Sequence, residues 1–120
     1  MDDLINTKAK QLFNIGYVFP YQRLIITNTL RAAGYYGVDE KTEVLDKQIV
    51  LLPTGSGKSL CFMLPGILLD GITLIVFPLL SLMADQERRI IEAGASVTTL
   101  KGGMTKEEIS KSYIYCKKYT

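Results

Sequence analysis

The residues best able to do chemistry in this 120-residue sequence form one segment, Leu52-Pro-Thr-Gly-Ser-Gly-Lys-Ser59, called here the glycine loop. Gly55 and Gly57 let an anion approach the backbone closely, because no side chain stands in the way. The N–H groups of such a loop, and those that begin a helix directly after it, can point at phosphate oxygens. We therefore predict that the glycine loop binds the phosphates of a nucleoside triphosphate.

The end of the glycine loop supplies a cation and a hydroxyl, two groups used in phosphoryl transfer. Lys58 would neutralise charge on the β- and γ-phosphates, and the Ser59 hydroxyl would bind Mg²⁺, so both are candidate catalytic residues. The segment matches the pattern G-x-x-x-x-G-K-[ST], except that Leu52 replaces the first glycine. The predicted cofactor-binding residues of the loop are Pro53, Thr54, Gly55, Ser56, Gly57, Lys58 and Ser59.

Hydrolysis would also require an acidic residue at the end of an apolar strand to hold the metal ion. The one superficial match, Ile67-Leu-Leu-Asp70, lies at the end of a predicted helix and therefore has the wrong context. Arg88 and Arg89 fall on a predicted amphipathic helix, where a solvent-exposed position is expected rather than an arginine finger. We expect these residues to bind a nucleotide without completing the machinery that hydrolyses it.

The pattern of apolar residues predicts how the glycine loop is positioned. Buried strands are predicted at 48–52, 72–77 and 96–100, with helices at 58–70 and 79–93 between them. This βαβ order predicts an α/β fold with a parallel sheet and flanking helices, incomplete at three strands. Two leading helices are predicted within residues 1–34, the first capped by Asp2 or Asp3 and ended near Gly16, the second running from Pro20 to Gly34.

The remaining segments carry less information. Residues 35–47 are polar and aperiodic, and we predict a surface loop or insertion there. The sequence from Thr105 to Glu108 predicts a capping box that opens a last helix. The final twenty residues, 101–120, hold five lysines and two glutamates, which we interpret as a solvated helix face rather than a phosphate-binding one.

Composition excludes several classes of function. The chain has no histidine and two cysteines, Cys61 and Cys116, so neither a Ser-His arrangement nor a zinc site or disulfide framework is predicted. The formal net charge is +2. The longest apolar stretches contain prolines and fall short of the roughly 20 residues that a bilayer span requires. The acidic N-terminus does not resemble a secretory signal, so we expect a cytoplasmic protein, nucleoid-associated if the source is bacterial.

A longer pattern around the glycine loop resembles the RecQ family of DNA helicases. The continuation to Leu60-Cys-Phe-Met-Leu-Pro65 is similar to the first helicase motif of that family. The segment Thr73-Leu-Ile-Val-Phe-Pro-Leu-Leu-Ser-Leu-Met-Ala-Asp-Gln86 resembles its motif Ia, and Gly16-Tyr17 with Pro20-Tyr-Gln22 resembles its motif 0. The resemblance covers nearly the whole chain in the expected order.

This resemblance implies an ATP-dependent motor of helicase superfamily two, which unwinds DNA in the 3′-to-5′ direction and has single-stranded and duplex DNA as partners. Gln22 would bind the adenine edge, because an amide can pair with N6–H and N7 together. Pro78, Ser81 and Gln86 would face DNA. The chain would be the N-terminal portion of the first RecA-like lobe: leading helices with motif 0 at 1–34, an insertion at 35–47 and a P-loop βαβ core at 48–120.

Phe19 departs from the family, which usually has a basic residue before this proline, and motifs II to VI are not found within the 120 residues. Two alternatives remain open. One is a fragment of a DEAD-box RNA helicase, although the stretch after Pro78 lacks the Thr-Arg-Glu-Leu sequence of that group. The other is a non-catalytic ATP- or DNA-binding module.

Overall fold

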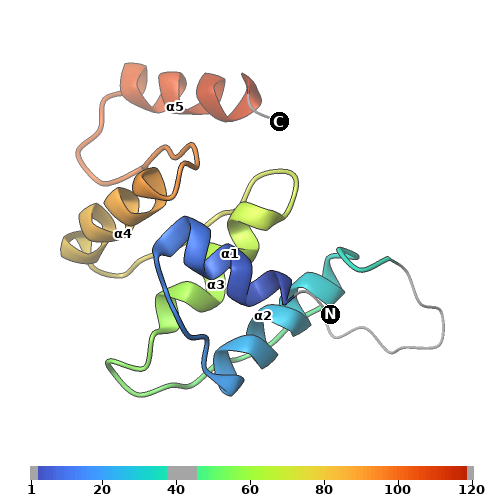
Figure 1. Cartoon of the computed structure of the whole chain (residues 1–120). Helices are drawn as coiled ribbons and strands as arrows, with labels where there is room; N and C mark the ends of the chain where they lie inside the picture. The colour runs from blue at the N-terminus through green and yellow to red at the C-terminus, as the bar shows by residue number, and fades with distance from the viewer. Residues whose placement is uncertain (1–2, 38–45, 119–120) are drawn as a thin grey trace. The chain divides into compact units, whose positions relative to one another are not determined.

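The computed structural model describes residues 3–37 and 46–118, with side chains as far as Ser112. The chain divides into two compact units, Met1–Leu69 and Asp70–Thr120, which are described separately below. Within the described residues the regular structure consists of five α-helices, three in the first unit and two in the second (Figure 1). The predicted insertion at 35–47 falls largely outside the described residues.

The first helix of unit 1, α1 (Leu4–Phe13), begins where its cap was predicted. The Asp3 side chain accepts a hydrogen bond from the backbone N–H of Asn6 at 3.2 Å, which satisfies one of the free donors at the helix start. The helix ends at Asn14, whose φ of 54° is left-handed. The predicted end at Gly16 is therefore wrong: asparagine tolerates this conformation and stops the helix two residues earlier.

The second helix, α2 (Pro20–Ala32), has a proline at its first position and a glycine just beyond its end, as predicted. The N–H groups of Gly34 and Tyr35 donate to the carbonyl oxygens of Arg31 and Leu30, at 3.0 and 2.9 Å. This pair of bonds is a Schellman motif, and Gly34 provides the positive φ, 77°, that it needs. The third helix, α3 (Lys58–Leu68), starts at Lys58, so the last two residues of the glycine loop form its beginning.

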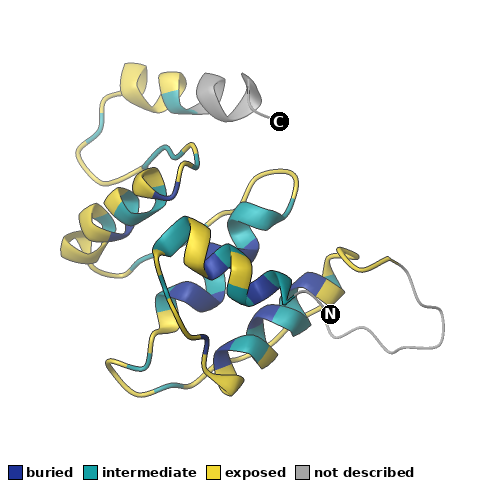
Figure 2. Ribbon diagram, in the orientation of Figure 1, coloured by how far each residue is buried: buried dark blue, intermediate teal, exposed yellow. Residues whose placement is uncertain are grey.

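The core of unit 1 lies where α3 packs against α2 and α1. Apolar residues three and four positions apart give each helix one buried stripe, and these stripes appear dark blue in Figure 2. The buried cluster consists of Ile5, Ala9, Val18, Ile26, Leu30, Leu60 and Leu64. Cys61, next to this cluster in sequence, is also buried, and burial raises the pKa of its thiol. The core thus fixes the start of α3, and with it the glycine loop, relative to α2.

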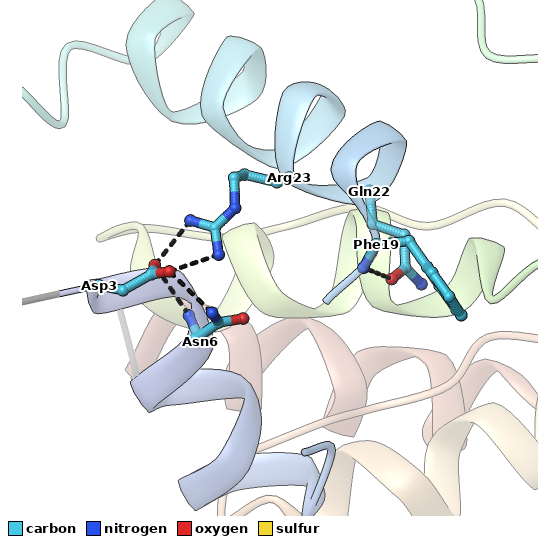
Figure 3. Close-up of polar contacts among 5 residues, drawn as sticks. All are labelled: Asp3, Asn6, Phe19, Gln22 and Arg23. Carbon is cyan, nitrogen blue, oxygen red and sulfur yellow. Dashed lines mark hydrogen bonds and ion pairs between the residues drawn. The ribbon is translucent and has the colours of Figure 1, made fainter. Parts of the chain in front are cut away.

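An ion pair joins α2 to the start of α1. The Arg23 guanidinium donates from both Nη atoms to the two carboxylate oxygens of Asp3, with Nη1 at 2.6 Å from Oδ1 (Figure 3). The hydrogen bond from Arg23 lowers the pKa of Asp3 below its ordinary value. The same carboxylate caps α1, so one side chain serves both contacts.

Unit 2 contains α4 (Leu80–Glu92) and α5 (Lys106–Lys118). The predicted cap of the last helix is confirmed, since the Thr105 hydroxyl oxygen accepts from the backbone N–H of Glu108 at 3.2 Å. Side-chain hydrogen bonds connect the segment between the helices to both of them: Thr99 donates to Glu87 at 3.0 Å, and Thr98 donates to Ser112 at 3.1 Å.

The predicted strands at 48–52, 72–77 and 96–100 are not formed in the described residues, and the predicted sheet is not confirmed. A strand is stable when its backbone groups pair with a neighbour and its apolar side chains are covered. Here Ile49 and Leu74 are 91% and 85% exposed, so the runs at 48–52 and 72–77 bury little apolar surface. The segment 96–100 is half-buried at its centre and has only two apolar residues. No helix in the part of the chain that is described combines the length and apolar character needed to cross a membrane.

Leu64→Ala tests the helical core. Leu64 is 0% exposed in α3, so removing its side chain should leave a cavity and lower the free energy of unfolding by about 2–5 kcal/mol. Leu24→Ala is the matched control, because Leu24 is 62% exposed, and it should cost less than about 0.5 kcal/mol. Urea denaturation followed by circular dichroism measures both, and equal losses would contradict the assignment of the core.

Asp3→Asn tests the ion pair, because asparagine can still cap α1 but cannot pair with Arg23. With its side chain 39% exposed, the pair should contribute no more than about 1 kcal/mol near pH 7. A lowered carboxylate pKa means that this contribution is present above the unfolded pKa of about 4 and is lost as the pH falls below it. The stabilities of the two proteins, measured by urea denaturation, should converge at low pH, and a constant difference would refute the ion pair's role.

Candidate nucleotide-binding site

The glycine loop turns tightly between Pro53 and α3. The backbone N–H of Ser56 donates to the carbonyl oxygen of Pro53 at 3.3 Å, and the Ser56 hydroxyl donates to the same oxygen. Gly55 and Gly57 both have positive φ, 83° and 78°, which glycine adopts without strain. The two glycines singled out by the sequence therefore occupy backbone conformations that other residues would adopt only with strain.

The first turn of α2 contacts the glycine loop through two successive side chains. The Tyr21 hydroxyl donates to the carbonyl oxygen of Ser56 at 2.6 Å, and the Gln22 amide nitrogen donates to that of Gly57 at 3.0 Å. Gln22 is 5% exposed. The structure thus brings together the predicted motif 0 glutamine and the predicted phosphate-binding loop, which are 35 residues apart.

The Gln22 amide is held from both ends. Its oxygen accepts a hydrogen bond from the backbone N–H of Phe19 at 2.9 Å, as Figure 3 shows, while its nitrogen reaches Gly57. A Cβ atom built on Gly57 would lie 2.4 Å from that nitrogen. Glycine at position 57 is therefore required for the close approach of Gln22 as well as for the positive φ.

Lys58 and Ser59 are the first two residues of α3. The N–H groups of a first helical turn have no partner within the helix, and the positive end of the helix dipole lies there. The exposed Lys58 side chain returns across the loop, and its Nζ donates to the carbonyl oxygen of Leu52 at 3.3 Å. Ser59 is half-buried, and Pro53 and Thr54 are exposed. A cation, a hydroxyl and helix-start donors are thus gathered at one place.

The predicted DNA-facing residues belong to unit 2, at the start of α4 and along it. Pro78 and Ser81 are exposed, whereas Gln86 is 8% exposed and its amide oxygen has no hydrogen-bond partner among the described residues. These three residues are therefore not equivalent: two are open to a ligand, and the third is covered.

The predicted solvent-exposed position is confirmed for Arg88, whereas Arg89 is half-buried. Arg88 donates to Asp85 at 2.6 Å and to Glu92 at 3.1 Å, both on its own helix, so it is a paired surface residue. Asp70 lies just after the end of α3 and is exposed, not at the end of a strand. Sequence analysis assigned no role to Tyr21. An aromatic residue beside the motif 0 glutamine, in the first turn of a helix, was the available signal.

Taken together, the loop and the start of α3 are suited to holding a polyphosphate. Comparison with known proteins decides the family. Residues 19–118 match the sequence profile of the DEAD/DEAH box helicases. This chain belongs to that family. Membership of the DEAD/DEAH box helicase family implies a RecA-like P-loop fold.

Within the DEAD/DEAH box family, the chain is similar to RecQ-type helicases. It is 45% identical to ATP-dependent DNA helicase Q1 of Rattus norvegicus over 60 residues, which are 50% of this chain and 10% of that protein. It is 35% identical to ATP-dependent DNA helicase RecQ of Bacillus subtilis (strain 168) over 68 residues, 57% of this chain and 12% of that protein. Against RecQ-like DNA helicase BLM of Xenopus laevis, the identity is 39% over 69 residues, 58% of this chain and 5% of that protein.

These matches confirm the resemblance to the RecQ group that the motifs indicated. The chain spans 5–12% of the length of these curated relatives. No solved structure matches it significantly.

Gly57→Ala tests the close contact between α2 and the glycine loop. Alanine at φ 78° should cost about 1–2 kcal/mol in stability, and displacing Gln22 should add about 0.5–1.5 kcal/mol. Gly55→Ala is the matched control, because Gly55 has a similar φ, 83°, but nothing within 4 Å of its Cβ position. Urea denaturation should show that Gly57→Ala costs more than Gly55→Ala, and that the excess disappears when Gln22→Ala is added. Equal costs for the two glycine variants would contradict the contact.

Proposed function

We propose that this chain is the nucleotide-binding part of a RecQ-like ATP-dependent DNA helicase, a protein that couples ATP hydrolysis to 3′-to-5′ unwinding. One observation carries the proposal: the motif 0 glutamine and the glycine loop meet through a 3.0 Å hydrogen bond in a chain of the DEAD/DEAH box helicase family. The relatives named as DNA helicases support DNA, single-stranded or duplex, as the partner of the whole protein. A non-catalytic binding module would need the same loop but no hydrolysis.

The phosphates of ATP would be held by Gly55, Gly57 and the N–H groups at the start of α3. Lys58 is the charged partner for the β- and γ-phosphates, and its ammonium already lies over the loop, 3.3 Å from the carbonyl oxygen of Leu52. Ser59 is the hydroxyl that would hold Mg²⁺, which supplies charge neutralisation when bound. Pro53, Thr54 and Ser56 shape the rest of the turn.

Gln22 is 5% exposed, so it is proposed to bind the adenine edge only after a local rearrangement uncovers the donor and acceptor capacity that its two hydrogen bonds leave unused. Its oxygen accepts one bond from Phe19 and has a second lone pair, and its nitrogen donates one hydrogen to Gly57 and has a second. An amide held at both ends is already oriented, so base recognition would cost little side-chain entropy. In this arrangement Gln22 senses the base and the phosphate loop together.

DNA contact by Pro78, Ser81 and Gln86 completes the proposal for the helicase. Pro78 and Ser81 are exposed and available to a nucleic-acid backbone. The 8% exposed Gln86 would act by its buried amide oxygen, which lacks a partner among the described residues, only after a local rearrangement of α4. A parallel sheet is also proposed for this chain, because the DEAD/DEAH box helicase family has a RecA-like P-loop fold.

Lys58→Ala tests the nucleotide site. Loss of a charge-assisted contact to phosphate should weaken binding of Mg-ATP by about 10- to 100-fold, measured by isothermal titration calorimetry on the full chain. Lys10→Ala, an exposed lysine on α1, is the control and should bind like the unchanged chain. Undiminished binding by Lys58→Ala would refute the role of the lysine. Absence of any heat with the unchanged chain would refute the site itself.

A further inference from the structure

Tyr21 holds a carbonyl of the glycine loop, and no motif role accounts for it. Its hydroxyl donates to the carbonyl oxygen of Ser56 at 2.6 Å, the shorter of the two bonds from α2 to the loop. The neighbouring Gln22 bonds the next carbonyl along, that of Gly57. Two successive residues of one helical turn thus donate hydrogen bonds to two successive peptide groups.

A hydrogen bond that fixes the carbonyl oxygen of a peptide group also orients the N–H of that same group. The described peptide bonds are all trans, so the N–H of each peptide points opposite to its carbonyl oxygen. With the carbonyls of Ser56 and Gly57 turned toward α2, the N–H groups of Gly57 and Lys58 are turned away from it. Those two N–H groups are among the donors that an anion at the start of α3 would use.

The ring of Tyr21 is itself held in place. It stacks on the ring of Phe19, with centroids 5.6 Å apart and an angle of 5° between the planes. The ring of Tyr17 packs edge-on against the ring of Phe19, with the two centroids 5.3 Å apart. Phe19 stands where related helicases usually have a basic residue, and here it gives Tyr21 a surface to pack on.

We propose that Tyr21 is a positioning residue of the nucleotide site: its hydroxyl holds the Ser56 carbonyl, so that the Gly57 N–H faces the phosphates before the nucleotide arrives. This inference rests on the proposed function, because it assumes that the glycine loop binds phosphates. Tyr21 acts through the backbone of the loop, so it contributes to the affinity for the phosphates and not to the affinity for the base.

Tyr21→Phe in the full chain is the test, because it removes the hydroxyl and keeps the stacked ring. Calorimetry with Mg-ATP and with magnesium tripolyphosphate, which has no base, should show both affinities lowered by the same factor of about 2 to 10, the ratio that one neutral hydrogen bond corresponds to. The amide resonance of Gly57 in a ¹H–¹⁵N spectrum should shift without ligand. Tyr36→Phe, an exposed tyrosine beyond the end of α2, is the matched control and should change neither affinity.

The outcomes separate the inference from the proposed function. Unchanged affinities for both ligands in Tyr21→Phe would overturn the inference and leave the nucleotide site intact. Weakened binding of ATP alone would also overturn it, because Tyr21 would then act on the base. If the unchanged chain bound neither ligand, the proposed function would fail. Separately, if the Gly57 amide resonance did not shift in Tyr21→Phe, the inference would be overturned, because the hydroxyl would not orient that peptide group. Phe19→Leu, which keeps the hydroxyl but removes the stacking ring, should produce a smaller loss of the same kind if Tyr21→Phe does not fold.

Discussion

The contact between Gln22 and the carbonyl oxygen of Gly57 depends on the absence of a side chain at position 57, and the candidate site depends on that contact. The 3.0 Å bond brings a helix from the beginning of the chain against a loop 35 residues later. A methyl group there would lie 2.4 Å from the amide nitrogen, well inside any tolerable contact. The glycine therefore serves two needs at once, a left-handed backbone and a short distance between α2 and the loop.

Three successive residues of α2 contact different parts of unit 1. Tyr21 and Gln22 reach the glycine loop, whereas Arg23 pairs with the Asp3 carboxylate that caps α1. Below them Ile26 and Leu30 are fully buried against α1 and α3. The loop is thus held by polar bonds at one end of α2, and α2 is held by an apolar core along its length. A site built on packed helices is more precise than one built on loops alone.

The two units differ in how much apolar surface they cover. Unit 1 has a continuous core of residues from three helices, and its helix ends are closed by an aspartate cap and a Schellman motif. In unit 2, α4 and α5 are connected through hydrogen bonds of Thr98 and Thr99, and α4 carries two ion pairs of Arg88 on its surface. The exposed apolar run at 72–77 belongs to this less covered unit. The candidate nucleotide site accordingly lies in the better covered unit 1.

Local sequence alone determined that the helices form and where several of them begin or end, because a cap or a helix-stopping glycine needs only neighbours a few residues away. The end of α1 at Asn14 is the exception. The starts at Pro20 and Lys58, the Schellman motif at Gly34 and the cap at Thr105 follow from such signals. The glycine loop could also be recognised from the sequence, since phosphate binding would require particular residue types in a fixed order. Strand pairing could not be predicted from local sequence, because an apolar run becomes a strand only when a distant partner satisfies the hydrogen bonds of its backbone. Only the tertiary structure decided that Tyr21 and Gln22 touch the loop, since that contact depends on how α2 packs on α3 and no residue spacing encodes a distance across 35 positions.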